Sequence, residues 1–460
     1  MPKHAKAPER PTKKARVEAT PKFSAGRVNG SPVPQKKAPT LKGKEKATKP
    51  TAENDPLPSS FKVIAGSYEK LLYGLEGTVS YDADSSVLAF ELKPLFIFAA
   101  HVSCIKAVAA SPHGGKWLAT GSADEIVKVW DLRRRKEIGG LMHHEGSITH
   151  LLFPSRSHLL SASEDGTLCL FRARDWAVLR ALRGHKGRVN SVAVHPSGKV
   201  ALSVGKDRTL RMWDLMRGKG CASTKLGKEA ELVRWSSDGS LFVVQVASTL
   251  DVYTTDMNLI HTITHPSRLQ DVKFCKRVNG EGDVLLAGAE DTKLSIYEIS
   301  TDPDTPPRII AEMTGHAKRV KAVDTLRIAL PAGAPRKTTT VVCTVSSDGR
   351  IHVYDLAALP AATPSSVLEI APVAAYDSKG TRLTCVTLAD GEVAGAAING
   401  KRKRSADDDE TQSDEDRDEN EEWGGVGAGT AEANGDDGSA WEDEDEAEEE
   451  GEGEGEVESD

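Results

Sequence analysis

The segment that decides the fold, residues 185–214, reads HKGRVNSVAVHPSGKVALSVGKDRTLRMWD. It opens on a histidine and closes on Trp213-Asp214, which end a run rich in strand-forming residues. Trp213 follows Asp207, an aspartate in a tight-turn sequence, by six residues. If such a unit recurs at a fixed spacing, it predicts a repeat architecture rather than an ordinary globular domain.

The unit recurs along the chain with a period of about 40 residues. A histidine stands at the start of each clear copy, at positions 101, 144, 185, 265 and 316. The interval between 185 and 265 is two periods. Residues 226–264 keep the apolar alternation but lack the histidine and the turn aspartate, so they form a degenerate copy. The six-residue spacing from turn aspartate to aromatic residue recurs in four pairs: Asp124 and Trp130, Asp165 and Phe171, Asp291 and Tyr297, and Asp348 and Tyr354.

Within a copy, the histidine, a hydroxyl, the aspartate and the tryptophan can form one buried hydrogen-bond chain. The carboxylate orients the imidazole, the hydroxyl bridges, and the indole N–H is the last donor. Two copies hold all four groups, whereas Phe171 offers no donor and Ala287 no hydroxyl in two of the others. We therefore expect a structural role for these residues rather than a catalytic one. The two complete tetrads are His101, Thr120, Asp124 and Trp130, and His185, Ser203, Asp207 and Trp213.

A seventh unit must be assembled from the two ends of the repeat region. Residues 61–65, 71–75 and 95–99 read as three short strands and lack an innermost one. Residues 381–389 match the innermost-strand pattern of the other units, and no strands of their own follow them. Pairing the two ends would close a ring and remove an open sheet edge. The sequence thus predicts one domain over residues 61–399, with its closing unit built from 61–99 and 381–389.

These units resemble the WD repeat, whose unit is a four-stranded blade of a β-propeller. Three stretches resemble more narrowly the PAK-interacting, maintenance-of-killer group of WD-repeat proteins: residues 63–69 (VIAGSYE), 195–211 (HPSGKVALSVGKDRTLR) and 382–385 (RLTC). The resemblance covers about residues 61–390. It implies an all-β, seven-bladed propeller. It further implies a nucleolar factor for maturation of the large ribosomal subunit and its pre-ribosomal RNA, and animal relatives imply negative regulation of p21-activated kinase.

The two ends of the chain differ sharply from the repeat region. Residues 1–60 carry 14 Lys or Arg against 5 Asp or Glu, whereas residues 400–460 carry 5 against 27. Neither stretch holds enough large apolar side chains to form a core. We expect a disordered basic tail over 1–60 and a disordered acidic tail over 400–460. A long basic leader and an acidic tail are departures from the group that the chain resembles.

Several classes of function are disfavoured by what the sequence lacks. No run of 18 apolar residues and no apolar leader occur, so membrane insertion and secretion are not expected. Its six cysteines are scattered without a Cys-x-x-Cys pair, and phosphate-loop, His-Glu-x-x-His and Gly-x-Ser-x-Gly motifs are missing. We expect no catalysis, no cofactor, no metal and no small-molecule substrate.

The candidate binding residues come from aligning the copies. An arginine stands immediately before the first apolar residue of four innermost strands, which predicts equivalent positions around one rim of the central channel: Arg188, Arg268, Arg319 and Arg382. Guanidinium groups suit phosphate or carboxylate, so we predict a docking rim for pre-ribosomal RNA or an acidic peptide. The alternative is an ordinary solvated surface. Neighbouring cations would strengthen the positive field: Lys186, Lys206, Arg208, Lys318 and Lys321.

Basic runs outside the repeats bear on location. Lys401, Arg402, Lys403 and Arg404 are typical of a nuclear-localisation signal. With the resemblance, they predict a noncatalytic scaffold in the nucleus and nucleolus, with pre-ribosomal proteins and pre-ribosomal RNA as partners. Two alternatives stay open, because a propeller does not determine function. One is an adaptor that binds and restrains a p21-activated protein kinase, and the other is a recognition subunit of a ubiquitin ligase or chromatin complex.

Overall fold

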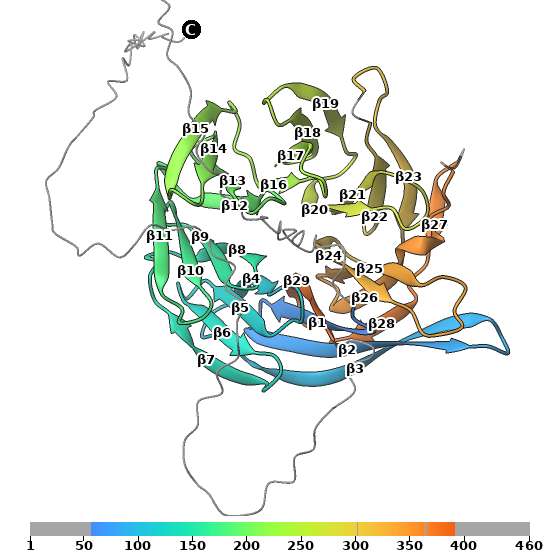
Figure 1. Ribbon diagram of the computed structural model, residues 1–460. Coiled ribbons are helices and arrows are strands. Elements are labelled where there is room, and N and C mark those ends of the chain that lie inside the picture. The colour runs from blue at the N-terminus through green and yellow to red at the C-terminus, as the bar shows by residue number, and fades with distance from the viewer. Residues whose placement is uncertain (1–56, 301, 363, 365, 392–460) are drawn as a thin grey trace, which may run out of the picture. The chain divides into compact units, whose positions relative to one another are not determined.

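The computed structural model describes residues 57–391 apart from 301, 363 and 365. These residues form seven sheets that stand as blades around a central channel (Figure 1). The predicted seven-bladed, all-β propeller is therefore confirmed. Residues 1–56 of the predicted basic tail and all of the predicted acidic tail lie outside the described residues, as do Lys401, Arg402, Lys403 and Arg404. Residues 57–60, which the sequence analysis assigns to the basic tail, are described, and the buried Ser60 begins the first strand of the propeller.

Four blades follow one another as simple meanders, each running from an innermost to an outermost strand. Their strands are β4 (Ile105–Ala110), β5 (Trp117–Ser122), β6 (Val127–Asp131) and β7 (Lys136–Leu141); β8 (Ile148–Ser155), β9 (His158–Ser163), β10 (Thr167–Arg172) and β11 (Val178–Arg183); β12 (Val189–Val194), β13 (Val200–Gly205), β14 (Thr209–Asp214) and β15 (Lys219–Lys225); and β16 (Leu232–Trp235), β17 (Leu241–Val246), β18 (Thr249–Thr254) and β19 (Leu259–Thr264). The degenerate copy predicted at residues 226–264 is thus a complete blade.

The next two blades are connected by a short strand that the second blade contributes to the sheet of the first. They comprise β20 (Leu269–Lys276), β21 (Asp283–Ala289), β22 (Leu294–Glu298) and β23 (Arg308–Met313), then β24 (Val320–Ala329), β25 (Thr338–Ser346), β26 (Arg350–Asp355) and β28 (Ala374–Asp377). Between β26 and β28 the chain makes a 3-10 helix, η2 (Leu356–Ala358). It then pairs β27 (Leu368–Ile370) in parallel with β23 of the preceding blade. This makes a five-stranded sheet that the repeat spacing does not predict.

The seventh blade joins both ends of the described chain. Its sheet order is β29 (Leu383–Asp390), β1 (Ser60–Ser67), β2 (Leu71–Asp82) and β3 (Val87–Ala99). The innermost strand β29 runs antiparallel to β1, with Val63 opposite Leu388 and Ala65 opposite Val386. Gly66 is required in this ladder, because a Cβ there would lie 2.6 Å from the Cγ2 of Ile105 in the next blade. The segment that the sequence assigns to the closing strand lies in this position.

The hydrophobic core lies between successive blades rather than within one. Leu160 and Leu168 of the β8–β11 blade, for example, pack against Val192 and Trp213 of the next blade. Side chains on the two faces of each inner strand are therefore both buried, as in β13 and β21. The outermost strands face solvent, and every residue of β15 is exposed.

The β2–β3 hairpin is longer than the sequence analysis predicted. Strands expected at 71–75 and 95–99 extend to Asp82 and back to Val87 (Figure 1). Val79, Phe90 and Leu92 on this extension pack against the core shared with the β24–β28 blade. The prediction stopped too early because contacts with a neighbouring blade stabilise the added length, and one blade's own pattern does not reveal them.

Closure by β29 gives the first prediction. Deleting residues 381–399 should lower the free energy of unfolding by more than about 5 kcal/mol, because several buried apolar side chains are lost and each contributes about 2–5 kcal/mol. Leu383 and Leu388 are 1% and 6% exposed. Chemical denaturation followed by tryptophan fluorescence measures the change. Deleting residues 401–460 is the control and should leave stability within about 0.5 kcal/mol. Equal losses from the two truncations would refute closure by this strand.

Candidate functional site at the channel mouth

The two predicted tetrads are assembled as continuous hydrogen-bond chains. In one, His185 Nδ1 lies 2.9 Å from Asp207, its Nε2 lies 2.7 Å from the Ser203 hydroxyl, and the Trp213 indole N–H donates to that hydroxyl at 2.8 Å. The chain of His101, Thr120, Asp124 and Trp130 has the same order, with 2.9, 2.8 and 2.9 Å. Because the carboxylate only accepts, Nδ1 carries the proton and Nε2 accepts from the hydroxyl.

Burial controls the charge of these chains. It lowers the pKa of the His101 and His185 imidazoles, and the partner carboxylates offset this shift only in part. Burial alone would raise the pKa of Asp124 and Asp207, but hydrogen bonds and the histidine partners outweigh it and lower both. At neutral pH each chain therefore holds a neutral imidazole and a carboxylate whose acceptor positions are used. The Thr120 and Ser203 hydroxyls are 0% exposed and already accept from an indole N–H, so these chains are structural elements.

In the unit without a bridging hydroxyl, a tyrosine completes the hydrogen-bond chain, and the sequence analysis missed this. Where Ala287 removes the hydroxyl, Tyr297 lies 2.7 Å from His265 Nδ1, and Nε2 lies 3.0 Å from Asp291. The imidazole thus uses its opposite nitrogens, and the phenol reaches it directly. Burial raises the pKa of Tyr297 to about 12, so the phenol keeps its proton and donates. The missing hydroxyl therefore does not leave the imidazole without a partner in this unit.

The next unit is also more complete than predicted. His316 Nε2 lies 2.8 Å from the Thr344 hydroxyl, and Nδ1 lies 3.3 Å from Asp348. The Tyr354 hydroxyl donates to the Thr314 carbonyl at 2.9 Å instead of joining the chain. A hydroxyl four residues before the turn aspartate, as in Ser203 and Asp207, was the sequence signal that could have identified Thr344.

Replacing Tyr297 with phenylalanine tests the hydrogen bond between its phenol and His265. Tyr297→Phe leaves a buried imidazole nitrogen without its donor and should lower the free energy of unfolding by about 1–3 kcal/mol. The matched control is Tyr253→Phe at the equivalent place in the degenerate blade, where the ring stacks on Phe242 and its hydroxyl makes no hydrogen bond in the described part of the chain. We expect less than about 0.5 kcal/mol there by urea denaturation. Equal losses of stability in the two variants would show that the Tyr297–His265 hydrogen bond does not stabilise this unit.

Acid should destabilise the propeller through its buried imidazoles. Burial, and then the charge of His316, lowers the pKa of His352 to about 4, although Asp348 opposes the shift. The two rings stack with centroids 4.1 Å apart. A folded pKa below the unfolded value near 6.5 means that the unfolded chain binds the proton first. The contribution is therefore complete above about pH 6.5 and is lost as pH falls toward 4.

The measurement is the free energy of unfolding at pH 7.5 and at pH 5. The wild type should lose stability on acidification, and His352→Phe, which keeps the stack but cannot titrate, should lose about 1–2 kcal/mol less, since one such group contributes at most about 1.4 kcal/mol per pH unit. The same pH dependence in both proteins would exclude His352 as a source.

The four predicted rim arginines do occupy equivalent positions, each directly before an innermost strand. All four, however, face a glutamate. Arg188 lies 2.9 Å from Glu229 and Arg268 2.7 Å from Glu231. The corresponding distances are 3.6 Å for Arg319 and Glu290 and 3.8 Å for Arg382 and Glu69. The rim is therefore a set of ion pairs, and the glutamates offset part of the positive field that the sequence predicted.

The degenerate blade explains part of this pairing. Glu231 immediately precedes Leu232 of β16, which is the position that arginine takes in four other blades. The acidic residue therefore sits between Arg188 and Arg268 of the two flanking blades, and Glu229 accompanies it. An alignment of single copies showed the arginines but not the carboxylates that complement them across a blade boundary.

The additional predicted cations are divided between exposed and enclosed positions. Lys206 and Arg208 lie in the β13–β14 turn, and Lys318 precedes β24; all three are exposed. Lys186 is exposed as well, and its backbone N–H donates to Asp207. Lys321 differs, because its ammonium donates to Gln270 at 2.6 Å and burial lowers its pKa. Lys321 therefore belongs to the channel wall rather than to the open rim.

A cavity of about 500 Å³ lies at the channel mouth on this rim. Lys106 pairs with Glu164 across it at 2.9 Å, and the pairs of Arg188 and Arg268 complete its charged wall. The Arg188 guanidinium donates to Asn190 through Nε and to Glu229 through Nη2, which leaves further N–H groups for a ligand. The lining residues are Lys106, Thr149, Glu164, Arg188, Asn190, Glu229, Glu231 and Arg268.

Below the mouth, charged side chains link the innermost strands of neighbouring blades. Asp271 accepts from the Val323 backbone N–H at 3.0 Å and from Arg234 at 3.2 Å. Asp324 accepts in the same way from the Leu388 backbone N–H at 2.7 Å and pairs with Lys273. Sequence reasoning missed these residues, because a lone charge inside an apolar strand shows no partner until the next blade is in place.

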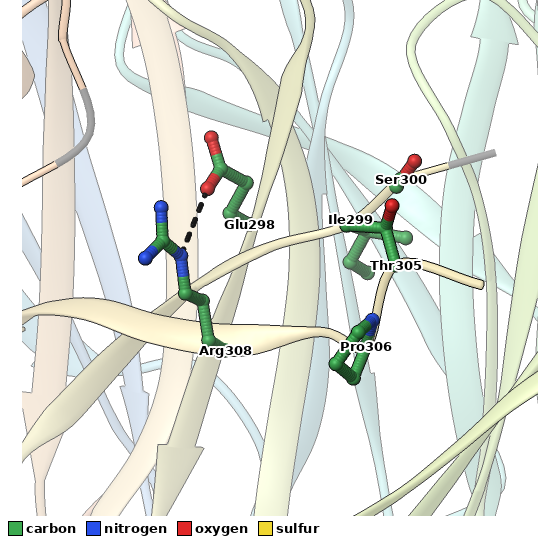
Figure 2. Close-up of a pocket in the computed structure, with 6 residues that line it drawn as sticks. All are labelled: Glu298, Ile299, Ser300, Thr305, Pro306 and Arg308. Atoms are coloured by element: carbon green, nitrogen blue, oxygen red, sulfur yellow. Dashed lines mark hydrogen bonds and ion pairs between the residues drawn. The ribbon is translucent and has the colours of Figure 1, made fainter. Parts of the chain in front are cut away.

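A second cavity, of about 550 Å³, is formed by the β22–β23 connection (Figure 2). Arg308 points toward Glu298 there, with Nε 3.3 Å from the carboxylate. The walls come mainly from this one connection, and its two charged groups neutralise each other, so the channel mouth is the better candidate. In the described part of the chain, no cluster of three or more His, Cys, Asp or Glu could hold a metal, and no helix is long and apolar enough to cross a membrane.

Known proteins match this chain over the propeller. The family "WD domain, G-beta repeat" matches residues 92–131, 135–172 and 176–214. The chain is 34% identical over 296 residues to the zebrafish (Danio rerio) "p21-activated protein kinase-interacting protein 1-like", covering 64% of this chain and 73% of that relative. It is 30% identical over 385 residues to "Protein MAK11" of Saccharomyces cerevisiae, covering 76% and 87%, and 32% identical over 326 residues to human "p21-activated protein kinase-interacting protein 1", covering 71% and 76%.

The chain belongs to the PAK-interacting/MAK11 family of WD-repeat proteins. The narrower resemblance found in the sequence is therefore confirmed. In this family member the WD-repeat match ends at Asp214, and only strand β15 separates it from the degenerate blade whose glutamates face the rim arginines. WD-repeat propellers are typically noncatalytic scaffolds for protein interactions, which agrees with the structural role of the histidine chains.

Proposed function

We propose that this PAK-interacting/MAK11 family member is a noncatalytic assembly factor for the large ribosomal subunit, acting in pre-ribosomal RNA processing in the nucleolus. Membership of the family that includes MAK11 supports the proposal, because the family resemblance implies that role. Basic residues at 401–404 support nuclear entry. Location stays a prediction, since that run is outside the described residues.

The channel mouth is the docking surface in this proposal. Its main support is that four arginines at equivalent positions are held by glutamates while 44–57% of each arginine side chain stays exposed. A guanidinium positioned on one edge can bind a carboxylate or phosphate of a partner with another edge. Pairing also reduces the conformational entropy that the side chain loses when a partner binds, because the side chain is already ordered. An acidic segment of a pre-ribosomal protein fits this surface.

A second candidate function is adaptor of a protein kinase. Its support lies in the relatives, since the zebrafish and human proteins are named as interacting with p21-activated protein kinase. A propeller can serve both functions through different faces. The two candidates predict different partners in the same purification.

Affinity purification of the full chain from nuclear extract tests the proposal. We expect large-subunit assembly factors and pre-ribosomal RNA to co-purify, and Arg188→Glu with Arg319→Glu to reduce their recovery at least fivefold. Charge reversal places like charges opposite Glu229 and Glu290 and repels an acidic partner. Quantitative mass spectrometry and RNA sequencing measure recovery.

The control is Arg308→Glu with Arg327→Glu, two exposed arginines away from the mouth. This variant should retain the associations. Recovery of a kinase without ribosomal factors would replace the proposed function with the adaptor. Unchanged recovery with the rim variant would remove the mouth from the docking surface.

A further inference from the structure

Charged residues are divided unevenly among the blades. Residues 101–228, which contain the three consecutive blades from β4 to β15, carry 22 Lys or Arg and 10 Asp or Glu. Residues 229–391 carry 16 and 20, and residues 61–100 carry 3 and 5. One sector of the ring, teal to green in Figure 1, is therefore strongly basic, while the rest is net acidic. A field of this kind attracts a polyanion to one side of the propeller.

Within that sector, one set of turns carries exposed cations away from the channel mouth. Because adjacent strands are antiparallel, the turns after the first and third strands of a blade lie on the face opposite the arginine rim. Six exposed cations lie in or beside these turns, and together we call them the basic arc: Arg134 and Arg135 at β6–β7, Arg156 at β8–β9, Arg174 at β10–β11, Lys199 at β12–β13 and Lys219 at β14–β15.

The basic arc differs from the rim because its charges are not neutralised. None of its six side chains makes an ion pair or a side-chain hydrogen bond with any residue that the structure describes. Each rim arginine, by contrast, faces a glutamate. A phosphate that binds the arc therefore has no carboxylate to displace.

Two aspartates of these turns accept hydrogen bonds from the backbone, and a third, Asp175, pairs with Arg172. Asp131, 4% exposed, accepts from the N–H groups of Arg133 and Arg134 at 2.8 and 2.9 Å. Asp214 accepts in the same way from the N–H groups of Met216 and Arg217, at 2.9 and 3.0 Å. These aspartates fix the turn geometry. Their neighbouring cations are thus presented from ordered turns.

The arc is continuous across blade boundaries. Trp117 of the first blade meets Trp176 of the second edge to face, with ring centroids 5.5 Å apart. Trp117 is paired with Asp131 at the β6–β7 turn, and Trp176 lies in the β10–β11 turn with Arg174. The third blade adjoins the second, because a Cβ at Gly218 would lie 2.4 Å from the Cδ of Arg180. Cations on the three blades therefore line one surface rather than three separate ones.

We propose that the basic arc binds the phosphate backbone of double-stranded RNA. Unpaired guanidinium and ammonium groups spread over three blades match a ligand whose charges repeat along its length. Duplex RNA fits such a surface, because it is recognised chiefly by its shape and backbone rather than through pockets for single bases. The biological meaning of this inference rests on the proposed function in ribosome assembly, but its binding test does not.

The test uses the purified full chain and a fluorescein-labelled RNA duplex of 20 base pairs, with Kd measured by anisotropy over a range of KCl concentrations. Replacing Arg134, Arg135, Arg156 and Arg174 with glutamine should raise Kd at least tenfold at 150 mM KCl. The slope of log Kd against log salt should fall by about 3.6, because four phosphate contacts are lost and each contributes about 0.9 on a duplex.

The matched control also carries four arginine-to-glutamine substitutions, but at the rim on the opposite face: Arg188→Gln, Arg268→Gln, Arg319→Gln and Arg382→Gln. It should keep Kd within about twofold and the slope within about 0.5. Because both variants keep residues 1–60 and 400–460, binding by the tails cancels in the comparison. Replacing the four arc arginines with lysine should restore most of the affinity, and thermal melting will show that every variant is folded.

Equal affinity and slope in the arc variant and the wild type would overturn the proposal. A rim variant that loses as much as the arc variant would also overturn it, because binding would then not be located on the arc. Poly-glutamate that displaces the duplex at equal concentration of charge would assign the arc to acidic proteins instead of RNA. A wild-type chain that does not bind the duplex but still co-purifies with ribosomal factors would refute this inference alone, not the proposed function.

Discussion

The antiparallel pairing of β1 with β29 is the interaction on which the propeller depends. It brings residues more than 300 positions apart into one ladder, from Phe61 opposite Asp390 to Ser67 opposite Leu383. Without it, two blades would expose their facing surfaces, and the core clusters on either side of the closing blade would lose a wall. Because every blade is stabilised chiefly by its neighbours, closure also limits how far any single blade can move. The channel, its mouth and both faces take their geometry from this pairing.

Polar chains inside the blades tolerate substitution because a different atom can complete them. His185 uses a serine and an indole, whereas His265 turns its ring and meets the Tyr297 phenol directly. In the degenerate blade, which lacks both histidine and turn aspartate, the Tyr253 ring stacks on Phe242 instead. In each of these blades, buried polar groups either form hydrogen bonds or are replaced by packed apolar side chains. The same four residues are not needed in every blade.

The two faces of the ring handle charge differently. At the channel mouth, arginines and glutamates from adjoining blades order one another, and the charged groups beneath them link innermost strands through Asp271 and Asp324. On the opposite face of three blades, aspartates hold the turns and leave the cations of the basic arc unpaired. A surface of ordered ion pairs suits selective docking of a peptide, whereas unpaired charge over a wide arc suits a polyanion. One propeller thereby offers two chemically distinct surfaces.

The sequence by itself determined the repeat period, the seven blades, the closing role of residues 381–389 and the two complete tetrads. These features depend on local alternation and on residues at fixed spacings within one copy, as at Asp207 and Trp213. Only the tertiary structure decided which groups meet across blade boundaries: Glu231 beside Arg268, Asp271 beneath Val323, and the extended β2–β3 hairpin against its neighbour. The physical reason is that an ion pair or a packed side chain is specified by distance in space, and residues of adjoining blades lie about 40 positions apart with no pattern that links them.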